Sequence, residues 1–390
     1  MIAPMTPPPL ALYVHLPWCV RKCPYCDFNS HRAPDSLPID DYVRALLADL
    51  DRDLCDYPAL RSRPIASVFF GGGTPSLFPP SAIGSILDGA AARLSLPDGI
   101  EVTLEANPGT TEHARFAGYR QAGVNRISLG VQSFDDAKLE RLGRIHGSDE
   151  ARRAAREVLD AGFAELNIDL MYALPDQDLS GALDDVQAAI ALSPTHVSHY
   201  QLTLEPQTQF AARPPTLPDE DLAFAMMDEC QHRLADAGYH QYETSAYARE
   251  GHRCRHNLNY WAFGDYLGVG AGAHGKLSVD GGIRRRWKHK HPRAWQAAAG
   301  ADAAIGGDDA ISAADLPFDF MMNALRLNHG FELGAYESAT GLGRATIMAV
   351  LDDAGARGLV DREGENVRAS ALGRRFLNDL LTLFLPSSRR

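Results

Sequence analysis

Hydrophobic runs alternate with amphipathic segments along the first half of the chain. Six runs are apolar and rich in β-branched or aromatic residues, a pattern that predicts buried strands over Leu12–Leu16, Ala66–Phe70, Glu101–Ala106, Arg126–Val131, Leu166–Tyr172 and His196–Leu204. Between them, apolar positions recur with helical spacing over Ile39–Leu54, Ser81–Leu94, Thr111–Ala122, Asp149–Ala161 and Leu179–Leu192. Such alternation is typical of parallel strands covered by helices, so the predicted fold class is α/β. Six units are too few for an ordinary closed eight-stranded barrel.

Polar or glycine-rich motifs lie at or near the carboxyl end of each predicted strand. A cysteine-rich segment follows the first strand, and the glycine run Gly71–Gly73 follows the second. The remaining strands carry polar residues near their ends, namely Glu105 and Asn107, Gln132 and Ser133, Asp169, and Tyr200 and Gln201. Barrel chemistry gathers at the carboxyl ends of the strands. The sequence therefore predicts that these motifs share one site.

The second half of the chain departs from the regular alternation. We expect residues 1–9 to be a flexible N-terminus and residues 10–215 to form the partial barrel. Residues 216–296 are expected to form a barrel-capping extension that carries the motif HNLNYW. Residues 297–314 are rich in alanine and glycine with few large apolar side chains, so we expect a linker there.

Residues 315–390 are expected to form a separate α+β domain. Helices are predicted over Phe318–Leu327, Leu333–Thr340 and Ile347–Arg357, followed by a hairpin around Glu363–Gly364 and a last helix over Ala371–Phe384. This order resembles a winged helix. Winged helices often bind DNA, but this segment is rich neither in lysine nor in clustered arginine. A docking or partner-binding role is therefore favoured.

Composition and charge narrow the classes of function. The 390 residues are 45% apolar and 23% charged, which is ordinary for a soluble globular protein. The net charge of −12 argues against a nucleic-acid-binding surface over the whole molecule. The N-terminus lacks the pattern of a signal peptide, and no apolar run reaches membrane-spanning length. We expect a cytoplasmic protein, with peripheral contact at the inner face of the membrane left open.

Three of the six cysteines, Cys19, Cys23 and Cys26, lie in one segment with the spacing Cys-x3-Cys-x2-Cys. The other three are scattered, so the set is not a disulfide framework. Three thiolates can hold three irons of a 4Fe–4S cluster and leave the fourth iron open to a small molecule. Structural zinc needs four ligands, and His15 or His31 would have to be the fourth. Spacing alone leaves both alternatives open.

Further motifs favour the cluster. YVHLPWC, CPYCDF, GGGTPS, EANP, GVQSF, NIDLMYALP and HNLNYW occur in one characteristic order. On these motifs the chain, from about Leu12 to its C-terminus, resembles the radical S-adenosylmethionine (SAM) superfamily and, within it, the oxygen-independent coproporphyrinogen III oxidase-like family. The resemblance implies a partial (β/α)6 barrel with a 4Fe–4S cluster on the three cysteines. SAM would chelate the open iron and, on one-electron reduction, give a 5′-deoxyadenosyl radical.

The same resemblance assigns a set of SAM-binding residues: Tyr13, Gly72, Gly73, Thr74, Glu105, Gln132, Arg144 and Asp169. Their chemistry fits, because carboxylates accept hydrogen bonds from ribose hydroxyls or an amino group and arginine pairs with a carboxylate. The glycines allow the backbone to approach a ligand closely. Without the resemblance, the glycine run is equally explained as a tight turn, Arg144 as a surface charge and Tyr13 as a core residue.

The motif HNLNYW, His256–Trp261, resembles one implicated in heme binding in the heme-chaperone branch of this family. Imidazole is a standard axial ligand of heme iron, so His256 is the predicted heme ligand. A hydrogen-bonded structural histidine is the alternative. Cys254 and His274 are further candidate ligands.

Two departures from the oxidase pattern favour the heme-chaperone branch. Phe28 stands where the oxidase has a fourth cysteine, and the oxidase carries a longer N-terminal extension. The leading hypothesis is a chaperone that binds heme and delivers it to hemoproteins, including membrane-bound respiratory enzymes. The alternative is oxidative decarboxylation of coproporphyrinogen III to protoporphyrinogen IX. A third hypothesis is a zinc-stabilised regulator that binds DNA, although no nucleic-acid partner is expected.

Overall fold

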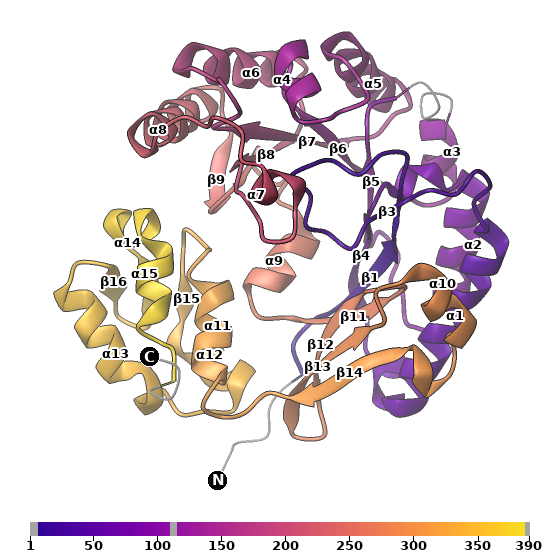
Figure 1. Ribbon diagram of the computed structural model, residues 1–390. Helices are drawn as coiled ribbons and strands as arrows, with labels where there is room; N and C mark the ends of the chain where they lie inside the picture. Colours follow the sequence, from indigo (N-terminus) through magenta and orange to yellow (C-terminus); the bar gives the residue numbers. More distant parts are fainter. Residues whose placement is uncertain (1–6, 110–114, 387–390) are drawn as a thin grey trace.

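The fold is organised around one curved sheet, seen in a computed structural model that describes residues 7–109 and 115–386 (Figure 1). Its twelve strands lie in the order β14-β13-β12-β11-β1-β4-β5-β6-β7-β8-β10-β9. The six predicted strands are confirmed as consecutive parallel neighbours: β1 (Leu10–Leu16), β4 (Ile65–Gly72), β5 (Glu101–Ala106), β6 (Arg126–Gln132), β7 (Glu165–Tyr172) and β8 (His196–Gln201). The two edge strands, β14 and β9, are not paired with each other, so the barrel is partial.

Helices cover the outer face of the parallel strands (Figure 1). They are α1 (Ile39–Asp56), α2 (Pro80–Ala91), α3 (Phe116–Gln121), α4 (Asp136–Arg141), α5 (Ser148–Asp160) and α6 (Leu179–Ala191). The helix predicted over Thr111–Ala122 begins at Phe116, and residues 111–114 lie outside the described residues. Of the flexible segment predicted over residues 1–9, residues 1–6 lie outside them too.

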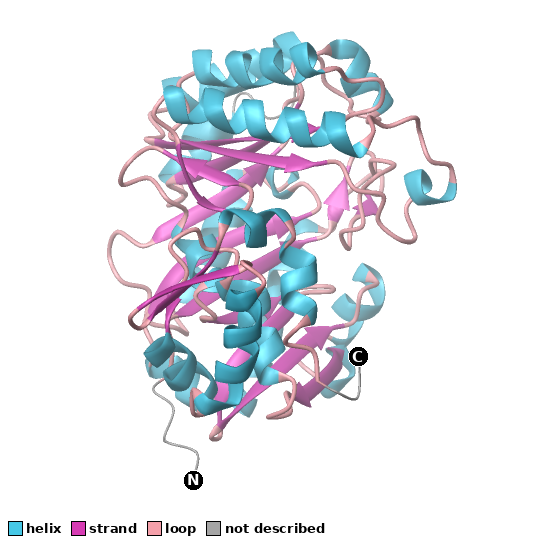
Figure 2. Cartoon of the chain, turned by 90° about the vertical axis from the view of Figure 1, so that its left-hand side faces the viewer, coloured by secondary structure: helices cyan, strands magenta, loops and turns pink. Residues whose placement is uncertain are grey.

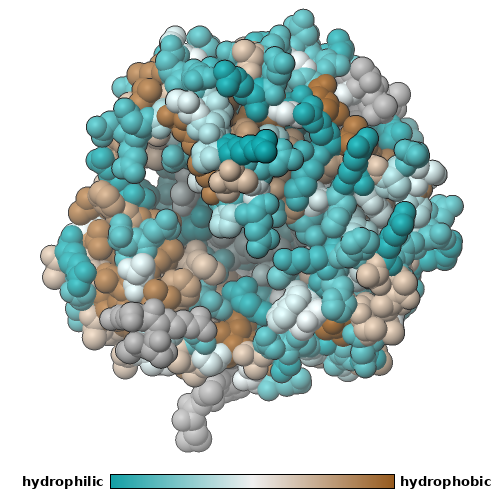
Figure 3. Space-filling view, viewed as in Figure 1, coloured by the Kyte–Doolittle hydropathy of each residue, from teal (hydrophilic) through white to brown (hydrophobic). Residues whose placement is uncertain are grey.

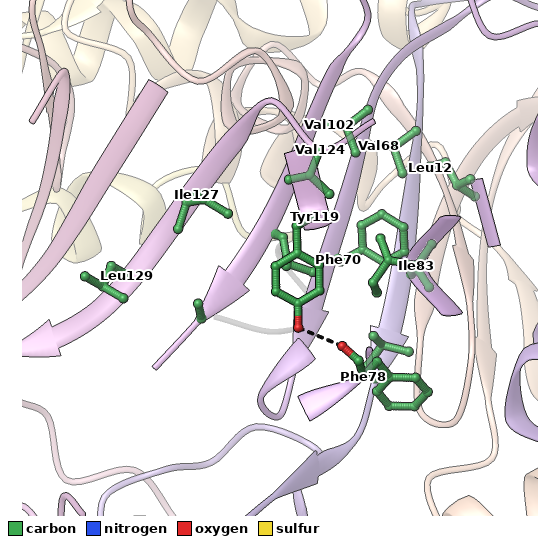
Figure 4. Close-up of a cluster of buried hydrophobic side chains, with 14 of the residues drawn as sticks. Leu12, Val68, Phe70, Phe78, Ile83, Val102, Tyr119, Val124, Ile127 and Leu129 are labelled. Carbon is green, nitrogen blue, oxygen red and sulfur yellow. Dashed lines mark hydrogen bonds between the residues drawn. The ribbon is translucent and has the colours of Figure 1, made fainter. Parts of the chain in front are cut away.

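Strand alternation separates the core from the interior of the barrel. Val68 and Phe70 of β4 are fully buried against the helices, and Figure 4 shows them beside Tyr119, whose hydroxyl donates to the Phe78 carbonyl at 2.7 Å. Their neighbours in the strand, such as Phe69, point to the other face and line the cavity inside the barrel. The side chains on the outer face of the sheet therefore form the core with the helices. The side chains on the inner face are available to form a site.

The segments after the sixth strand extend the sheet at both edges, and only the strand over Gln241–Ala248 could be predicted from the sequence. β11 (Asp265–Val269) is a seventh parallel strand beside β1, and β12 (His274–Val279), β13 (Gly282–Lys288) and β14 (Ile305–Ala310) continue antiparallel. At the other edge, α8 (Glu220–Asp236) precedes β9 (His240–Glu243) and β10 (Ala246–Ala248). Residues 216–296 thus mostly lengthen the sheet rather than cap it.

The linker predicted over residues 297–314 is wrong in its secondary structure, because β14 lies within it and pairs with β13. Its glycines serve packing. A Cβ added at Gly307 would lie 2.0 Å from Cζ2 of Trp287, and one at Gly306 would lie 2.7 Å from Cδ1 of the same indole. Gly306 and Gly307 leave room for the Trp287 side chain of the neighbouring strand. The small residues of this segment therefore serve close packing and do not indicate a flexible linker.

Helix α9 (Arg255–Trp261) carries HNLNYW and packs against β4, β1 and β11, with His256 beside Ser67 near the start of β4. Its position is fixed by Glu101, the first residue of β5. The two carboxylate oxygens of Glu101 accept from the backbone N–H groups of Arg255 and His256 at 3.1 and 3.0 Å. One buried carboxylate therefore anchors the start of this helix inside the lower end of the barrel.

The C-terminal domain is built around a second hydrophobic cluster, which Phe263 and Ile283 join from outside the domain. Figure 2 shows helices and strands packed together near the C-terminus, and their order along the chain is the predicted one. Helices α11 (Leu316–Ala324), α12 (Leu333–Thr340) and α13 (Ala345–Ala356) precede the hairpin of β16 (Val360–Glu363) and β17 (Asn366–Ala369), to which β15 (Phe331–Glu332) adds a strand. The predicted last helix divides into α14 (Ala371–Arg375) and α15 (Leu377–Thr382). Arg326 binds Glu243 at 3.1 Å, so the domain covers the exposed edge of β9.

A buried group of charges fastens α1 to β13. The Lys288 ammonium lies 2.7 Å from one carboxylate oxygen of Asp49 and of Asp53, and all three side chains are buried. Arg286 of the same strand reaches Asp53 at 2.7 Å and Asp56 at 2.8 Å.

Within the described part of the chain, no helix is long and apolar enough to cross a bilayer.

Candidate functional site

The three cysteines lie at the mouth of the barrel. β1 ends at Leu16, and β2 (Trp18–Cys19) pairs with β3 (His31–Arg32), so the segment between them forms a closed loop that carries Cys23 and Cys26. All three cysteines are half-buried and line one cavity of about 370 Å³. Figure 3 shows a recess near the centre of this face, bordered mainly by hydrophilic residues.

A chain of hydrogen bonds joins two of the cysteines across the mouth. Thr74 Oγ1 donates to Cys19 Sγ at 3.5 Å, Asn107 Nδ2 donates to Thr74 Oγ1 at 2.8 Å, and Arg144 Nη2 donates to Asn107 Oδ1 at 2.6 Å. Arg144 Nη1 then reaches Cys23 Sγ at 3.6 Å. Asn107 was absent from the predicted SAM-binding set, although its place in the EANP motif after β5 could have indicated it.

The environment of the sulfurs suits ligands of a cluster. Burial raises the pKa of Cys19 and of Cys26 above the ordinary thiol value, so these groups need a positive partner to become thiolates. Hydroxyls lie close to both, since Ser30 Oγ is 3.6 Å from Cys26 Sγ and Thr74 donates to Cys19. Such hydrogen bonds to sulfur stabilise thiolate ligands and tune the cluster. The three cysteines therefore fit a 4Fe–4S group.

The zinc alternative loses both of its candidate fourth ligands. His15 Nε2 lies 2.9 Å from the Asn29 carbonyl and its Nδ1 lies 3.1 Å from the Tyr13 hydroxyl. His31 Nε2 lies 3.1 Å from Asn29 Oδ1. Over residues 7–109 and 115–386, no three His, Cys, Asp or Glu side chains converge as ligands of a single metal ion. Both histidines thus hold the loop in place.

The glycine run packs directly against the backbone of the cysteine loop. Gly73 N donates to the Leu16 carbonyl and Thr74 N to the Trp18 carbonyl, both at 2.8 Å. A Cβ on Gly73 would lie 2.6 Å from the Trp18 carbonyl oxygen. Gly72 has φ of +115° and donates its N–H to Glu105 Oε2 at 3.2 Å. The run is a tight turn that also shapes the wall of the cavity.

Substituting Gly73→Ala is expected to weaken SAM binding about tenfold or more, because the new methyl group must push the turn away from the cysteine loop at an overpacking cost of about 1–3 kcal/mol. Equilibrium binding of SAM to the reconstituted protein measures this. The control is Gly84→Ala on α2, where an added Cβ meets Ala122 Cβ at an ordinary 3.6 Å. Equal affinities of the two variants would contradict this role of the turn.

Two carboxyl groups face the cavity from neighbouring positions. Burial raises the pKa of Glu105 to about 8, and the nearby Asp169 raises it further. Burial also raises the pKa of Asp169, although Asn167 Nδ2 donates to it at 2.8 Å and Ser128 Oγ at 3.2 Å. The positive charge of Arg144 opposes the increase in the pKa of Asp169 only in part. Two crowded carboxyls in this cavity are suited to a ligand that brings an amino group and hydroxyls.

The raised pKa of Glu105 predicts a pH-dependent gain in stability for Glu105→Gln. Wild-type Glu105 binds a proton more tightly when folded, so the stability it contributes is present below its ordinary pKa and is lost as pH rises toward about 8. Each pKa unit corresponds to about 1.4 kcal/mol. We expect the variant and wild type to unfold alike at about pH 4 and the variant to be more stable at about pH 8. Thermal unfolding of the ligand-free protein checks this, and a difference that does not change with pH would contradict it.

The remaining predicted SAM residues divide between two connected cavities. Gln132, with φ of +74°, accepts from the Tyr200 hydroxyl at 2.8 Å and lines the first cavity together with Arg144. Tyr13 instead lines a neighbouring cavity of about 380 Å³, which shares Gly72, Glu105 and Phe28 with the first. The structure thus brings all the predicted SAM residues to these two cavities, and Tyr13 lines only the second of them.

His256 lies apart from the mouth. It is buried on α9, its Nδ1 is 2.9 Å from Ser67 Oγ, and its ring stacks on Phe69 with centroids 4.7 Å apart. His256 Nε2 is buried without a hydrogen-bond partner among the described residues. Cys254 is also buried and lines the inner end of the first cavity, whereas His274 is exposed and lines the second. The three candidate heme ligands therefore occupy three different environments.

Two protein-family models match parts of this chain. The Radical SAM superfamily profile matches residues 13–186, and the HemN C-terminal domain profile matches residues 311–376. The heme chaperone HemW of Escherichia coli is 49% identical over 379 residues, covering 97% of this chain and 98% of that protein. The chain belongs to the HemW family of the radical SAM superfamily. The HemW of Haemophilus influenzae is 47% identical over 380 residues, with 97% and 98% covered.

The fold of this HemW-family chain also matches a solved structure. Coproporphyrinogen III oxidase, HemN, of Escherichia coli superposes with a TM-score of 0.81, covering 98% of this chain and 91% of that one. Identity is 21%, so the likeness shows the fold alone. The predicted family and fold class are confirmed. Membership in the radical SAM superfamily implies a 4Fe–4S cluster and SAM, while the role of each individual residue stays a prediction.

Proposed function

We propose that this HemW-family protein binds heme and delivers it to hemoproteins, using a scaffold that carries a 4Fe–4S cluster and SAM. The observation that carries the proposal is 49% identity, over nearly the full length of both chains, to a protein named heme chaperone HemW. Phe28, which is 65% exposed at the mouth of the barrel, supports the choice because the oxidase pattern has a fourth cysteine there.

In this proposal the mouth of the barrel holds the cluster and SAM. Cys19, Cys23 and Cys26 would hold the cluster, which together with SAM would supply one-electron chemistry. Arg144, buried beside Cys23, would pair with the SAM carboxylate. Glu105 and Asp169 would accept hydrogen bonds from its amino group and hydroxyls. The backbone of the glycine run would close the cavity against water.

His256 is the proposed axial ligand of heme. Burial lowers its pKa to about 3, so the imidazole is neutral at physiological pH, as metal ligation requires. Its Nε2 has no hydrogen-bond partner among the described residues, so this nitrogen could coordinate iron. Because the ring is enclosed by Phe69 and Tyr260, with centroids 4.7 and 5.0 Å away, iron would reach it only after α9 or its aromatic neighbours move. Cys254 and His274 remain the alternative ligands.

The proposed recipients are hemoproteins, including membrane-bound respiratory enzymes, and the proposed location is the cytoplasm, with peripheral contact at the inner membrane face. The C-terminal domain is the proposed docking element, since brown, hydrophobic residues gather over it in Figure 3. Leu372 and Phe376 are exposed by 46% and 44%. Partner docking therefore suits this domain better than DNA binding.

Binding of hemin and turnover of coproporphyrinogen III, measured on the same anaerobically reconstituted protein, test the proposal. We expect a Soret band from bound heme that weakens in His256→Ala, and no protoporphyrinogen IX. The alternative function, oxidative decarboxylation of coproporphyrinogen III, is supported by the shared fold of HemN and would give protoporphyrinogen IX. An unchanged heme spectrum in His256→Ala would remove that residue from the proposal.

A further inference from the structure

A second, larger cavity lies on the outer side of the cysteine loop. It has a volume of about 810 Å³, within the range of about 300–1,000 Å³ of pockets that hold drug-sized ligands. Its walls come from β2, β3, the segment that follows β3, and α10 (Pro292–Ala298). We call it the outer groove and define it by Trp18, Arg32, Pro34, Pro38, His291 and Arg293.

The outer groove combines an apolar floor with unpaired cations. Pro34 and Pro38 supply apolar surface, and Trp18 also lines the groove, although its side chain is almost fully buried in the core. Arg32 and Arg293 are exposed, and neither forms an ion pair or side-chain hydrogen bond with another described residue. Among the described residues that line the groove there is no aspartate or glutamate, although the protein carries a net charge of −12. An acidic ligand with an extended apolar body therefore matches this surface.

One imidazole in the outer groove is available as a ligand. His31 is held by its contact with Asn29, whereas His291 makes no side-chain hydrogen bond to any part of the chain that the structure describes. The two rings meet edge to face, with centroids 5.9 Å apart and planes at 69°. This contact orients the His291 ring within the groove while leaving its nitrogens free. Imidazole is a common ligand of iron.

We propose that the outer groove is a second heme site, in which His291 ligates the iron and Arg32 and Arg293 pair with the two propionates. The inference rests on the proposed function, since that function identifies heme as the cargo. A planar metalloporphyrin has the three features that the groove matches: an apolar face, two carboxylates, and a metal that takes an imidazole.

The outer groove is separated from the cluster ligands only by a two-stranded ribbon. In its register Trp18 lies opposite His31, and Cys19 lies opposite Arg32. Cys19 lines the inner cavity, while Trp18 and Arg32 line the outer groove. Heme in the groove would thus leave the SAM cavity free, and the protein could hold its cargo at the surface while the cluster and SAM stay in place.

Titration of the full-length protein with hemin, and separately with hemin dimethyl ester, tests the outer groove. We expect Arg32→Glu combined with Arg293→Glu to raise the dissociation constant of hemin about tenfold and to leave that of the ester, which lacks carboxylates, unchanged. His291→Ala should shift the Soret maximum of bound hemin. The controls are Arg153→Glu with Arg156→Glu on the exposed side of α5, and His289→Ala, which is exposed but outside the groove.

The outcomes separate the two proposals. Hemin affinity and spectrum that are unchanged in the groove variants, but lost in His256→Ala, would overturn the outer groove and leave the proposed function standing. Equal weakening of hemin and of its ester by the charge reversals would also overturn the assignment, because the propionates would not be the contacts. Failure of the wild-type protein to take up any hemin would overturn both.

Discussion

Cys26→Ser is expected to leave the protein without its iron–sulfur cluster after anaerobic reconstitution. The predicted cluster has only three protein ligands, and a serine hydroxyl is a much harder and less readily ionised ligand than a thiol. Among the described cysteines that line the cavity, Cys19, Cys23 and Cys26 lie on the loop, whereas Cys254 lies apart from them beside Glu101. Analysis of iron and sulfide, together with the visible absorption spectrum, measures the loss.

The matched control for this experiment is Cys55→Ser. Cys55 is free and exposed on α1, away from the cavity. We expect it to retain wild-type iron, sulfide and unfolding behaviour. Wild-type iron content in Cys26→Ser would mean that the three-cysteine loop does not hold the cluster, and binding of zinc alone by the wild type would restore the zinc alternative.

Lys288→Met is expected to destabilise the fold by about 3–5 kcal/mol, the range typical of breaking a buried ion pair on one side. The substitution removes the cation that lies between Asp49 and Asp53 and leaves two buried carboxylates facing each other. Burial already raises the pKa of Asp49 to about 6, and Lys288 opposes that increase. Urea unfolding at neutral pH measures the loss.

The pH dependence of the Lys288→Met effect provides an internal check. Without the ammonium, the pKa of Asp49 should rise further, so the folded variant retains a proton that the unfolded chain releases. The defect should therefore shrink as pH falls below about 6 and grow as pH rises. Lys290→Met, two residues away and exposed, is the control. Equal stability of the two variants at neutral pH would contradict the role of the buried cluster.

Sequence patterns predicted the parallel core because each of its strands is a compact apolar run. They missed β11 and β14, in which glycine replaces the expected apolar residues. Gly268 of β11 lies so close to the neighbouring strand that an added Cβ would be 2.0 Å from the His274 carbonyl oxygen, and Gly307 lies under Trp287. Close packing between strands requires glycine there, and nothing in hydrophobic periodicity distinguishes this use of glycine from a linker.

The candidate site was predictable to the extent that its motifs follow strand ends. The cysteine loop, the glycine run, Glu105 and Asp169 meet at one cavity as expected. The position of His256 was not predictable, because it depends on Glu101, whose carboxylate anchors α9 from a distant part of the chain. The link from Asn107 to both Thr74 and Arg144 likewise appears only when three strands come together.

Transfer of heme to an apo-hemoprotein tests the central claim most directly. The reconstituted protein would be loaded with heme, separated from free heme and mixed anaerobically with an apo-respiratory hemoprotein, while coproporphyrinogen III in the same mixture reports any decarboxylation. The account predicts that the recipient gains heme faster than from an equal amount of heme on serum albumin and that coproporphyrinogen III is not consumed. Formation of protoporphyrinogen IX without transfer of heme would contradict it.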